Sequence, residues 1–235
     1  MCGRFVQHRA PIAYAEHFGL DVATLQLPNC PPRYNAAPTQ DLMVVRLNPH
    51  TGALDLSLLR WGLVPVWAKD PGGGARLINA RSESVAEKPT FRDAWRKKRR
   101  CIVPADGFYE WRRRNGAAQP FYITPADGAP MAFAGLWEGW KDPATGQWLR
   151  TFTILTCAAN ETLRPLHDRM PVVLAEADIS RFLAADNPRD LLRPAPAAQL
   201  TFWPVSPAVN AVRNDAAALI APVAPPDEDA TDPSA

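Results

Sequence analysis

A cysteine directly follows the initiator methionine in the opening stretch MCGRF. Methionine is easily removed when the next side chain is small, as cysteine is. Loss of Met1 would leave Cys2 with a free α-amine and a thiol on one carbon skeleton, which makes it a candidate for nucleophilic chemistry. The alternative is a structural role, because cysteine commonly packs as a small buried residue.

A carboxylate lies among aromatic residues in the stretch GFYEW. In a strand, Glu110 would face the same side as Phe108, opposite Tyr109 and Trp111. An apolar wall formed by Phe108 would raise the pKa of the carboxyl and suit it to proton transfer. The alternative is an edge-strand glutamate in solvent.

Two further stretches bring polar residues together. LHDRMP places His167 beside Asp168 and Arg169 in an expected loop, where functional residues often lie. The alternative is a turn in which Asp168 and Arg169 form a structural pair. NARSES places Asn79, Arg81 and Glu83 in quick succession after an apolar run; the expected strand pattern does not call for these polar residues.

The elements that must position these residues are mostly strands. Helices are expected over 11–19, over 89–98 with Thr90 as its cap, and over 176–185. Residues 42–47 and 54–61 are expected to form a hairpin, and the glycine-rich 70–75 a flexible loop. Later runs rich in aromatic and β-branched residues, separated by turn signals, predict an antiparallel meander over 101–105, 107–113, 120–124, 131–140 and 149–157, with a late strand over 200–205. We therefore expect one α+β domain around a curved, mostly antiparallel sheet.

The composition limits the class of protein. The 235 residues are 47% hydrophobic, enough for a sizeable core, and no stretch approaches the roughly 20 apolar residues of a membrane span. We expect no signal peptide, a cytoplasmic protein and reduced cysteines, with no disulfide framework, zinc site or cofactor. No phosphate-binding or dinucleotide-binding fingerprint is present.

The charge is unevenly distributed. The chain carries a net +2, and its last stretch holds four acids and no base, so the remainder carries +6. We expect a domain over 2–221 and a disordered, proline-rich acidic tail over 222–235. The bases concentrate in 95–100 and 111–114, which suggests a polyanionic partner such as nucleic acid. The alternative is a pair of solvated, exposed segments.

Six motifs together resemble one family. MCGRF, RYNAAPTQ, WGLVPVW, INARSES, CIVPADGFYEW and LHDRMPVVL resemble, in order, the motif series of the SRAP family, named for SOS response-associated peptidases. The resemblance spans nearly all of 2–220. It implies a compact α+β fold on a barrel-like sheet with short peripheral helices. It also implies a protein that recognises abasic sites in single-stranded DNA, crosslinks to them covalently and so protects the lesion during the DNA damage response.

The resemblance assigns catalytic roles to four residues. Cys2 matches the crosslinking residue, and Asn79 matches the asparagine beside the reacting sugar. Glu110 matches the catalytic glutamate, and His167 the active-site histidine.

It also implies a set of DNA contacts. Arg81 matches a phosphate contact, Arg4 and Trp67 match DNA-contacting positions, and Pro38 matches a wedge at the bases. Thr156 is retained in the matching stretch TCAAN and is counted with these contacts. Trp111 is a further candidate for stacking on an unpaired base, or else a core aromatic.

An N-terminal cysteine suits this chemistry. An abasic sugar opens to an aldehyde, which a primary amine attacks to form an imine. At pH 7.4 roughly a quarter of an α-amine is neutral, against about 0.1% of a lysine. The adjacent thiol can then close a five-membered thiazolidine, which an internal cysteine cannot form because its nitrogen is an amide.

Two other functions stay open at this stage. One is a cysteine-type autopeptidase that removes its own Met1, and the other is a noncatalytic module that binds single-stranded DNA. The partner expected from the resemblance is single-stranded DNA with abasic sites, bound by a monomer that has no membrane contact and associates with the nucleoid when on DNA.

Overall fold

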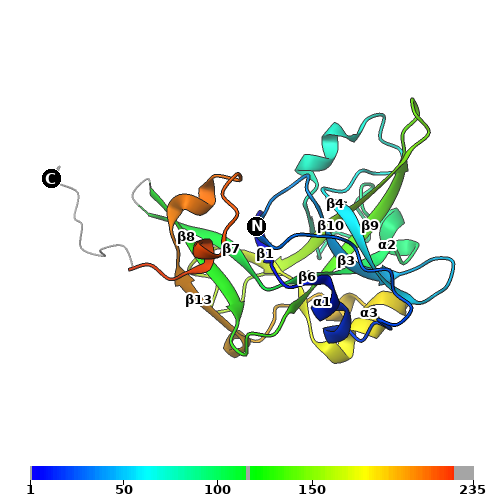
Figure 1. The fold of residues 1–235 in the computed structure, drawn as a ribbon. Coiled ribbons are helices and arrows are strands. Elements are labelled where there is room, and N and C mark those ends of the chain that lie inside the picture. The colour runs from blue at the N-terminus through cyan, green and yellow to red at the C-terminus, as the bar shows by residue number, and fades with distance from the viewer. Residues whose placement is uncertain (1, 115–116, 225–235) are drawn as a thin grey trace.

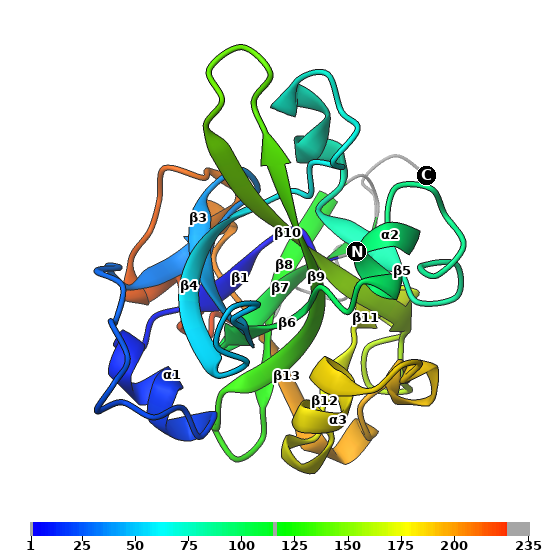
Figure 2. The ribbon, with the colours of Figure 1, turned by 90° about the vertical axis from the view of Figure 1, so that its right-hand side faces the viewer.

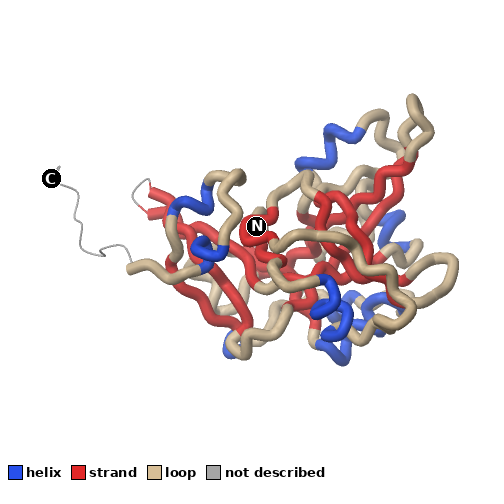
Figure 3. Tube along the Cα trace, viewed as in Figure 1, coloured by secondary structure: helices blue, strands red, loops and turns tan. Residues whose placement is uncertain are grey.

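The computed structural model describes residues 2–114 and 117–224, and most of its regular secondary structure lies in two β-sheets (Figures 1 and 3). The smaller sheet is antiparallel, with the strand order β13-β8-β7-β1-β2. Its strands are β1 (Phe5–Gln7), β2 (Arg33–Ala36), β7 (Gly107–Arg114), β8 (Ala117–Pro125) and β13 (Leu200–Pro204).

The larger sheet closes into a five-stranded barrel, β10-β4-β3-β6-β9, through pairing of β9 with β10 (Figure 2). It is mixed, because β10 runs parallel to β4 and to the added strand β5. The strands are β3 (Asp41–Leu47), β4 (Leu54–Trp61), β5 (Asn79–Arg81), β6 (Arg100–Ala105), β9 (Met131–Lys141), β10 (Trp148–Ala158), β11 (Arg169–Pro171) and β12 (Val173–Leu174). The barrel-like, mostly antiparallel α+β fold and the hairpin of β3 and β4 are confirmed.

The expected meander is correct only in part. The hairpins β7–β8 and β9–β10 form, but β6 pairs with β3 and β9 in the barrel, whereas β7 pairs with β1 and β8 in the smaller sheet. The chain changes sheets at Asp106, whose buried carboxylate accepts hydrogen bonds from Tyr14 Oη (2.5 Å) and Arg9 Nε (2.7 Å). These bonds hold the junction closed.

Three short α-helices and several 3₁₀ turns lie around the sheets. The helices are α1 (Pro11–His17), α2 (Arg92–Arg96) and α3 (Ile179–Ala184), and the 3₁₀ segments are Pro71–Arg76, Glu176–Asp178, Arg189–Leu191, Ala197–Gln199, Pro207–Asn210 and Ala217–Ile220. Pro11 suits the first position of α1, where the missing N–H costs nothing. Thr90 was wrong as a cap: α2 begins at Arg92 after Phe91 and has no side-chain cap.

The glycine-rich segment is not the expected flexible loop. Residues 71–76 form a 3₁₀ helix, and the Asp70 carboxylate accepts from Gly72 N at 2.9 Å. Gly74 is buried, and a Cβ there would lie 2.7 Å from the Gly62 carbonyl oxygen. Gly62 itself has φ +122°. Two glycines therefore let these backbones touch.

The core is divided by the smaller sheet. Phe5 and Phe108 point into the main cluster within the barrel, where Phe5 lies edge-on to Trp61 at 5.0 Å between ring centroids. On the other face Val6 and Tyr109 join a second cluster. Because neighbouring residues of β1 and β7 serve different clusters, the N-terminal strand is fixed from both sides.

The C-terminal segment runs along β13. Pro222 bridges to Val205, and Val223 N donates to the Pro204 carbonyl at 2.9 Å, two residues past the expected boundary at 221. The rest of the expected tail, 225–235, and the Asn-Gly turn at 115–116 lie outside the described residues. In the described part of the chain, no helix combines the length and apolar character needed to cross a bilayer.

Candidate functional site

Cys2 is buried in the main cluster and lies just before β1, whose N-terminal end is marked in Figure 1. The Asn79 amide donates to the Cys2 carbonyl oxygen at 2.8 Å. Asn79 opens β5, whose parallel pairing opposite Ile154 of β10 fixes its height along the barrel. The fold therefore brings together two predicted site residues that lie far apart in sequence.

Glu110 lies on β7 with only 5% of its surface exposed. The alternation expected from GFYEW is confirmed: Phe108 faces the main core, whereas Tyr109 and Trp111 contact the second cluster. The solvent-exposed edge glutamate is ruled out. Burial raises the pKa of Glu110, and the nearby charge of His167 opposes that rise. A carboxyl whose pKa is raised in this way is a candidate for general acid and base catalysis.

The Cys2 thiol is held in its protonated form. Burial raises the pKa of Cys2, and the negative charge of Glu110 raises it further. A thiolate that attacks first would need the opposite environment, such as a neighbouring cation. The site therefore favours a thiol that reacts as S–H and gives up its proton as it adds.

His167 lies in the loop before β11, with its side chain 32% exposed. Its Nδ1 accepts a hydrogen bond from Arg169 N at 2.9 Å, which assigns the proton of the neutral ring to Nε2. The same Nδ1 lies 2.8 Å from a carboxylate oxygen of Asp168. The backbone of Arg169 and the side chain of Asp168 thus hold the imidazole ring in place.

Arg81 and Thr156 face each other in the pairing of β5 with β10. Arg169 of β11 donates to the Thr156 carbonyl at 2.5 Å and forms a two-point pair with Glu83. The suggested structural pair of Asp168 with Arg169 is wrong, because Asp168 contacts His167 instead. The part Glu83 plays was missed; the available signal was its position two residues after Arg81.

Arg4 and Trp111 face the C-terminal segment. Arg4 donates to Asn35 Oδ1 and to the Val209 carbonyl, both at 2.9 Å, and Trp111 Nε1 donates to Asn210 Oδ1 at 2.7 Å. Burial lowers the pKa of Arg4. Arg4 immediately precedes β1, and its side chain lies on the side of the second cluster, where it contacts Val209.

Pro38 and Trp67 lie in loops of the barrel rim. Pro38 follows Ala36, which pairs with Phe5, so the antiparallel register carries it toward the Cys2 end of β1. The next residue, Thr39, has φ +73°, a strained conformation for a β-branched side chain. Trp67 is 63% exposed, a large apolar surface in contact with solvent.

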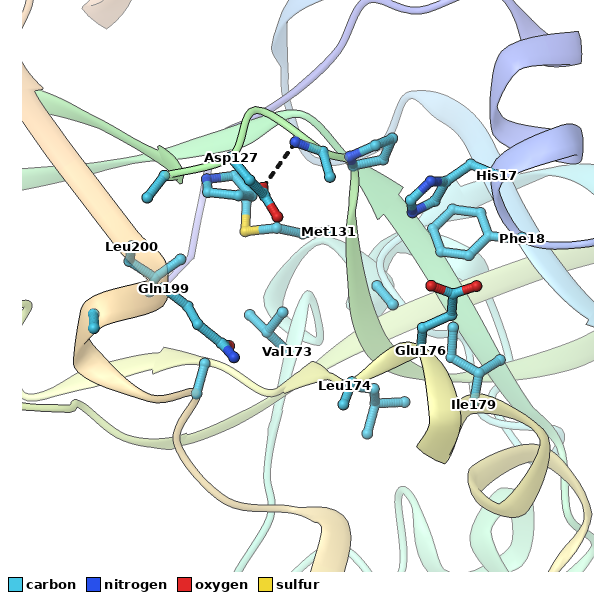
Figure 4. A pocket seen from close by; sticks show the side chains of 18 residues that line it. His17, Phe18, Asp127, Met131, Val173, Leu174, Glu176, Ile179, Gln199 and Leu200 are labelled. Carbon is cyan, nitrogen blue, oxygen red and sulfur yellow. Dashed lines mark hydrogen bonds between the residues drawn. The ribbon is translucent and has the colours of Figure 1, made fainter.

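A cavity of about 450 Å³ lies elsewhere, between the end of α1, the β8–β9 turn and the segment before α3 (Figure 4). Its floor is apolar, and the carboxylates of Asp127 and Glu176 lie at its rim. The ten predicted site residues do not line it. Within the described ranges, no cluster of three or more His, Cys, Asp or Glu side chains is placed to hold a metal ion.

Comparison with known proteins identifies relatives in sequence and in fold. The profile of a family described as SOS response associated peptidase (SRAP) matches residues 1–212. The abasic site processing protein YoqW of Bacillus subtilis strain 168 is 38% identical over 226 residues, which cover 94% of this chain and 99% of that protein. The abasic site processing protein YedK of Escherichia coli strain K12 is 34% identical over 233 residues, covering 95% and 100%. The crystal structure of a Bacteroides thetaiotaomicron protein, 22% identical, has the same fold, with a TM-score of 0.83 and coverage of 95% and 100%.

Proposed function

Because this chain belongs to the SRAP family and its relatives are named for abasic site processing, we propose that it processes abasic sites in DNA through a covalent bond to Cys2. The observation that carries the proposal is the anchoring of Cys2 by Asn79 beside the buried carboxyl of Glu110. The proposal requires loss of Met1, which frees the α-amine of Cys2.

The amine acts first. The neutral α-amine adds to the aldehyde carbon of the open sugar, and loss of water gives an imine. The Cys2 thiol then adds to the imine carbon, its proton moves to the nitrogen, and a thiazolidine closes. The hydrogen bond from Asn79 to the Cys2 carbonyl supports this reaction, because it holds the backbone of Cys2 and so positions both its amine and its thiol for the incoming sugar.

Glu110 and His167 move the protons. Sugar opening, water loss and ring closure each need a proton donor or acceptor. Glu110, whose pKa is raised by burial, serves as general acid and base at the imine carbon. His167, with its Nε2 proton and partial exposure, donates to the sugar oxygen.

The DNA partner is single-stranded. Arg4 and Arg81 contact phosphates, whereas Thr156, which is fully buried, supports this surface by holding Arg169 through its carbonyl. Pro38, Trp67 and Trp111 contact unstacked bases. The exposure of Trp67 supports this assignment, because base stacking needs a free aromatic face. Residues 2–221 form the catalytic domain, which acts as a monomer.

The proposal is tested with an oligonucleotide that carries one abasic site. The protein, with its mature N-terminus confirmed by mass, is incubated with the oligonucleotide and separated on a denaturing gel. We expect a shifted band that resists denaturant and is absent with an intact oligonucleotide. Binding of the abasic oligonucleotide without any denaturant-resistant band would instead indicate a noncatalytic binding module.

A further inference from the structure

Glu83 and Arg169 form a two-point ion pair close to Arg81 and Thr156, two of the predicted DNA contacts. Arg169 Nη1 donates to Glu83 Oε1 at 2.6 Å, and Nη2 donates to Oε2 at 2.9 Å. The Arg169 side chain is only 13% exposed, whereas that of Glu83 is 56% exposed. The cation is therefore built into the fold, and its partner lies on the solvent side.

Arg169 is held in place without Glu83. Its Nη2 also donates to the Thr156 carbonyl at 2.5 Å, and its backbone lies in β11, paired with Ala158. Glu83 lies in the turn after β5, and its other hydrogen bonds are local, to its own backbone and to Ser82. Of the two partners, the carboxylate is the one that can move away.

The occupied edge of Arg169 fits a phosphate as well as a carboxylate. Both anions accept two parallel N–H bonds from a guanidinium. Arg81, two residues before Glu83, lies opposite Thr156 in the strand pairing, so both cations flank one residue of β10. A strand that contacts Arg81 would also bring a phosphate to the edge that Glu83 covers.

We propose that the Glu83 carboxylate is an internal substitute for phosphate. It binds Arg169 in the free protein, and the DNA backbone displaces it. This inference rests on the proposed DNA-binding function. The exchange discriminates between ligands: an anion binds Arg169 only if it replaces the two bonds that Glu83 gives up. The Arg169 bonds hold the pKa of Glu83 below its usual range, so Glu83 stays ionised near neutral pH and the exchange depends on the ligand rather than on protonation.

The exchange has a distinctive salt dependence. Each phosphate neutralised by a free cation of the protein adds about 0.7 to the slope of log affinity against log salt for single-stranded DNA. At Arg169 this contribution is cancelled. The phosphate that binds Arg169 releases a salt cation, but the Glu83 carboxylate that it displaces takes up a salt cation in turn. Glu83→Gln removes the competitor, so the slope should steepen by about 0.7.

The test measures binding of an intact fluorescent oligothymidine by anisotropy over a range of KCl concentrations. E83Q is expected to bind about threefold more tightly than the wild type at low salt, the size of an exposed ion pair. The matched control is Glu87→Gln, which removes the same charge four residues away, where Glu87 lies 3.8 Å from Arg189. E87Q should change affinity by less than about twofold and leave the slope unchanged.

A second variant separates displacement from net charge. Glu83→Asp keeps the charge but withdraws the carboxylate by one methylene, so it should also bind more tightly than the wild type. Thermal unfolding shows whether each variant is folded. If E83Q does not fold, the binding measurement uses E83D instead. Weaker binding by E83Q and E83D would show that Glu83 positions Arg169 and would overturn the proposal, as would an E83Q slope equal to that of E87Q. If neither the wild type nor E83Q binds, the proposed function fails with it.

Discussion

Replacing Glu110 by glutamine keeps the shape of a buried side chain and removes its charge and its proton. Glutamate and glutamine have nearly the same volume, so the glutamine side chain should fit the buried site in which Glu110 is only 5% exposed. If Glu110 transfers protons during imine formation, Glu110→Gln should slow crosslinking by about 10²–10⁴-fold. Affinity for an intact oligonucleotide should hardly change, since the carboxyl faces the main core rather than the bases.

The same substitution should stabilise the fold at neutral pH. Burial raises the pKa of Glu110, so the folded state holds its proton more tightly than the unfolded state does. The resulting penalty is absent below the unfolded pKa of about 4.5, grows as pH rises toward the raised folded pKa, and is full above it. The stability advantage of E110Q should therefore be absent in acid and largest near neutral pH.

Three assays check these expectations. Single-turnover crosslinking and anisotropy with intact DNA separate rate from affinity, and urea unfolding at acid and neutral pH gives the stability difference. An unchanged crosslinking rate would remove Glu110 from the mechanism. An E110Q protein less stable than the wild type at neutral pH would refute the burial argument.

The remaining predictions concern the DNA and the barrel rim. Binding should favour single-stranded over paired DNA and weaken as KCl rises, because phosphate contacts release counterions; equal affinity for both forms in anisotropy would contradict this. Gly74→Ala should lower the free energy of unfolding by about 1–3 kcal/mol, because its Cβ meets the Gly62 carbonyl at 2.7 Å. Gly73→Ala is the matched control, with no atom within 4 Å of its Cβ; equal urea midpoints would rule the contact out.

Local sequence patterns correctly predicted the features that depend only on residues close together in the chain, such as side-chain direction along a strand and turns. The alternation in GFYEW correctly placed Phe108 and Glu110 on one face of a strand, because side-chain direction along a strand follows from the period of two. Positive φ at Gly128 and Gly146 likewise fits the expected turns. Local patterns also singled out the four candidate catalytic residues, whereas the DNA contacts at Arg4, Pro38 and Trp67 and the barrel came from the family resemblance.

Local sequence patterns could not predict contacts between residues that are far apart in the chain. The bond between Asn79 and Cys2 depends on the parallel pairing of β5 with β10, whose register no local pattern encodes. The strands before and after Asp106 follow each other directly, and nothing in their sequence indicates that they join different sheets, so this division was missed. Gly74 was taken as a flexible position because its close neighbour, Gly62, becomes visible only in the folded chain.

The central claim is that the α-amine and the thiol of Cys2 act together, and blocking the amine alone tests it most directly. Protein with a free N-terminal Cys2 and protein N-acetylated at Cys2 are each incubated with a defined abasic oligonucleotide and analysed by intact mass spectrometry. The free form should give a denaturant-resistant adduct with the summed mass of both partners less one water. The acetylated form, which keeps its thiol, should give none. A Cys2→Ala protein without Met1 should form only an imine that borohydride traps. A stable adduct from the acetylated protein would contradict the aminothiol mechanism.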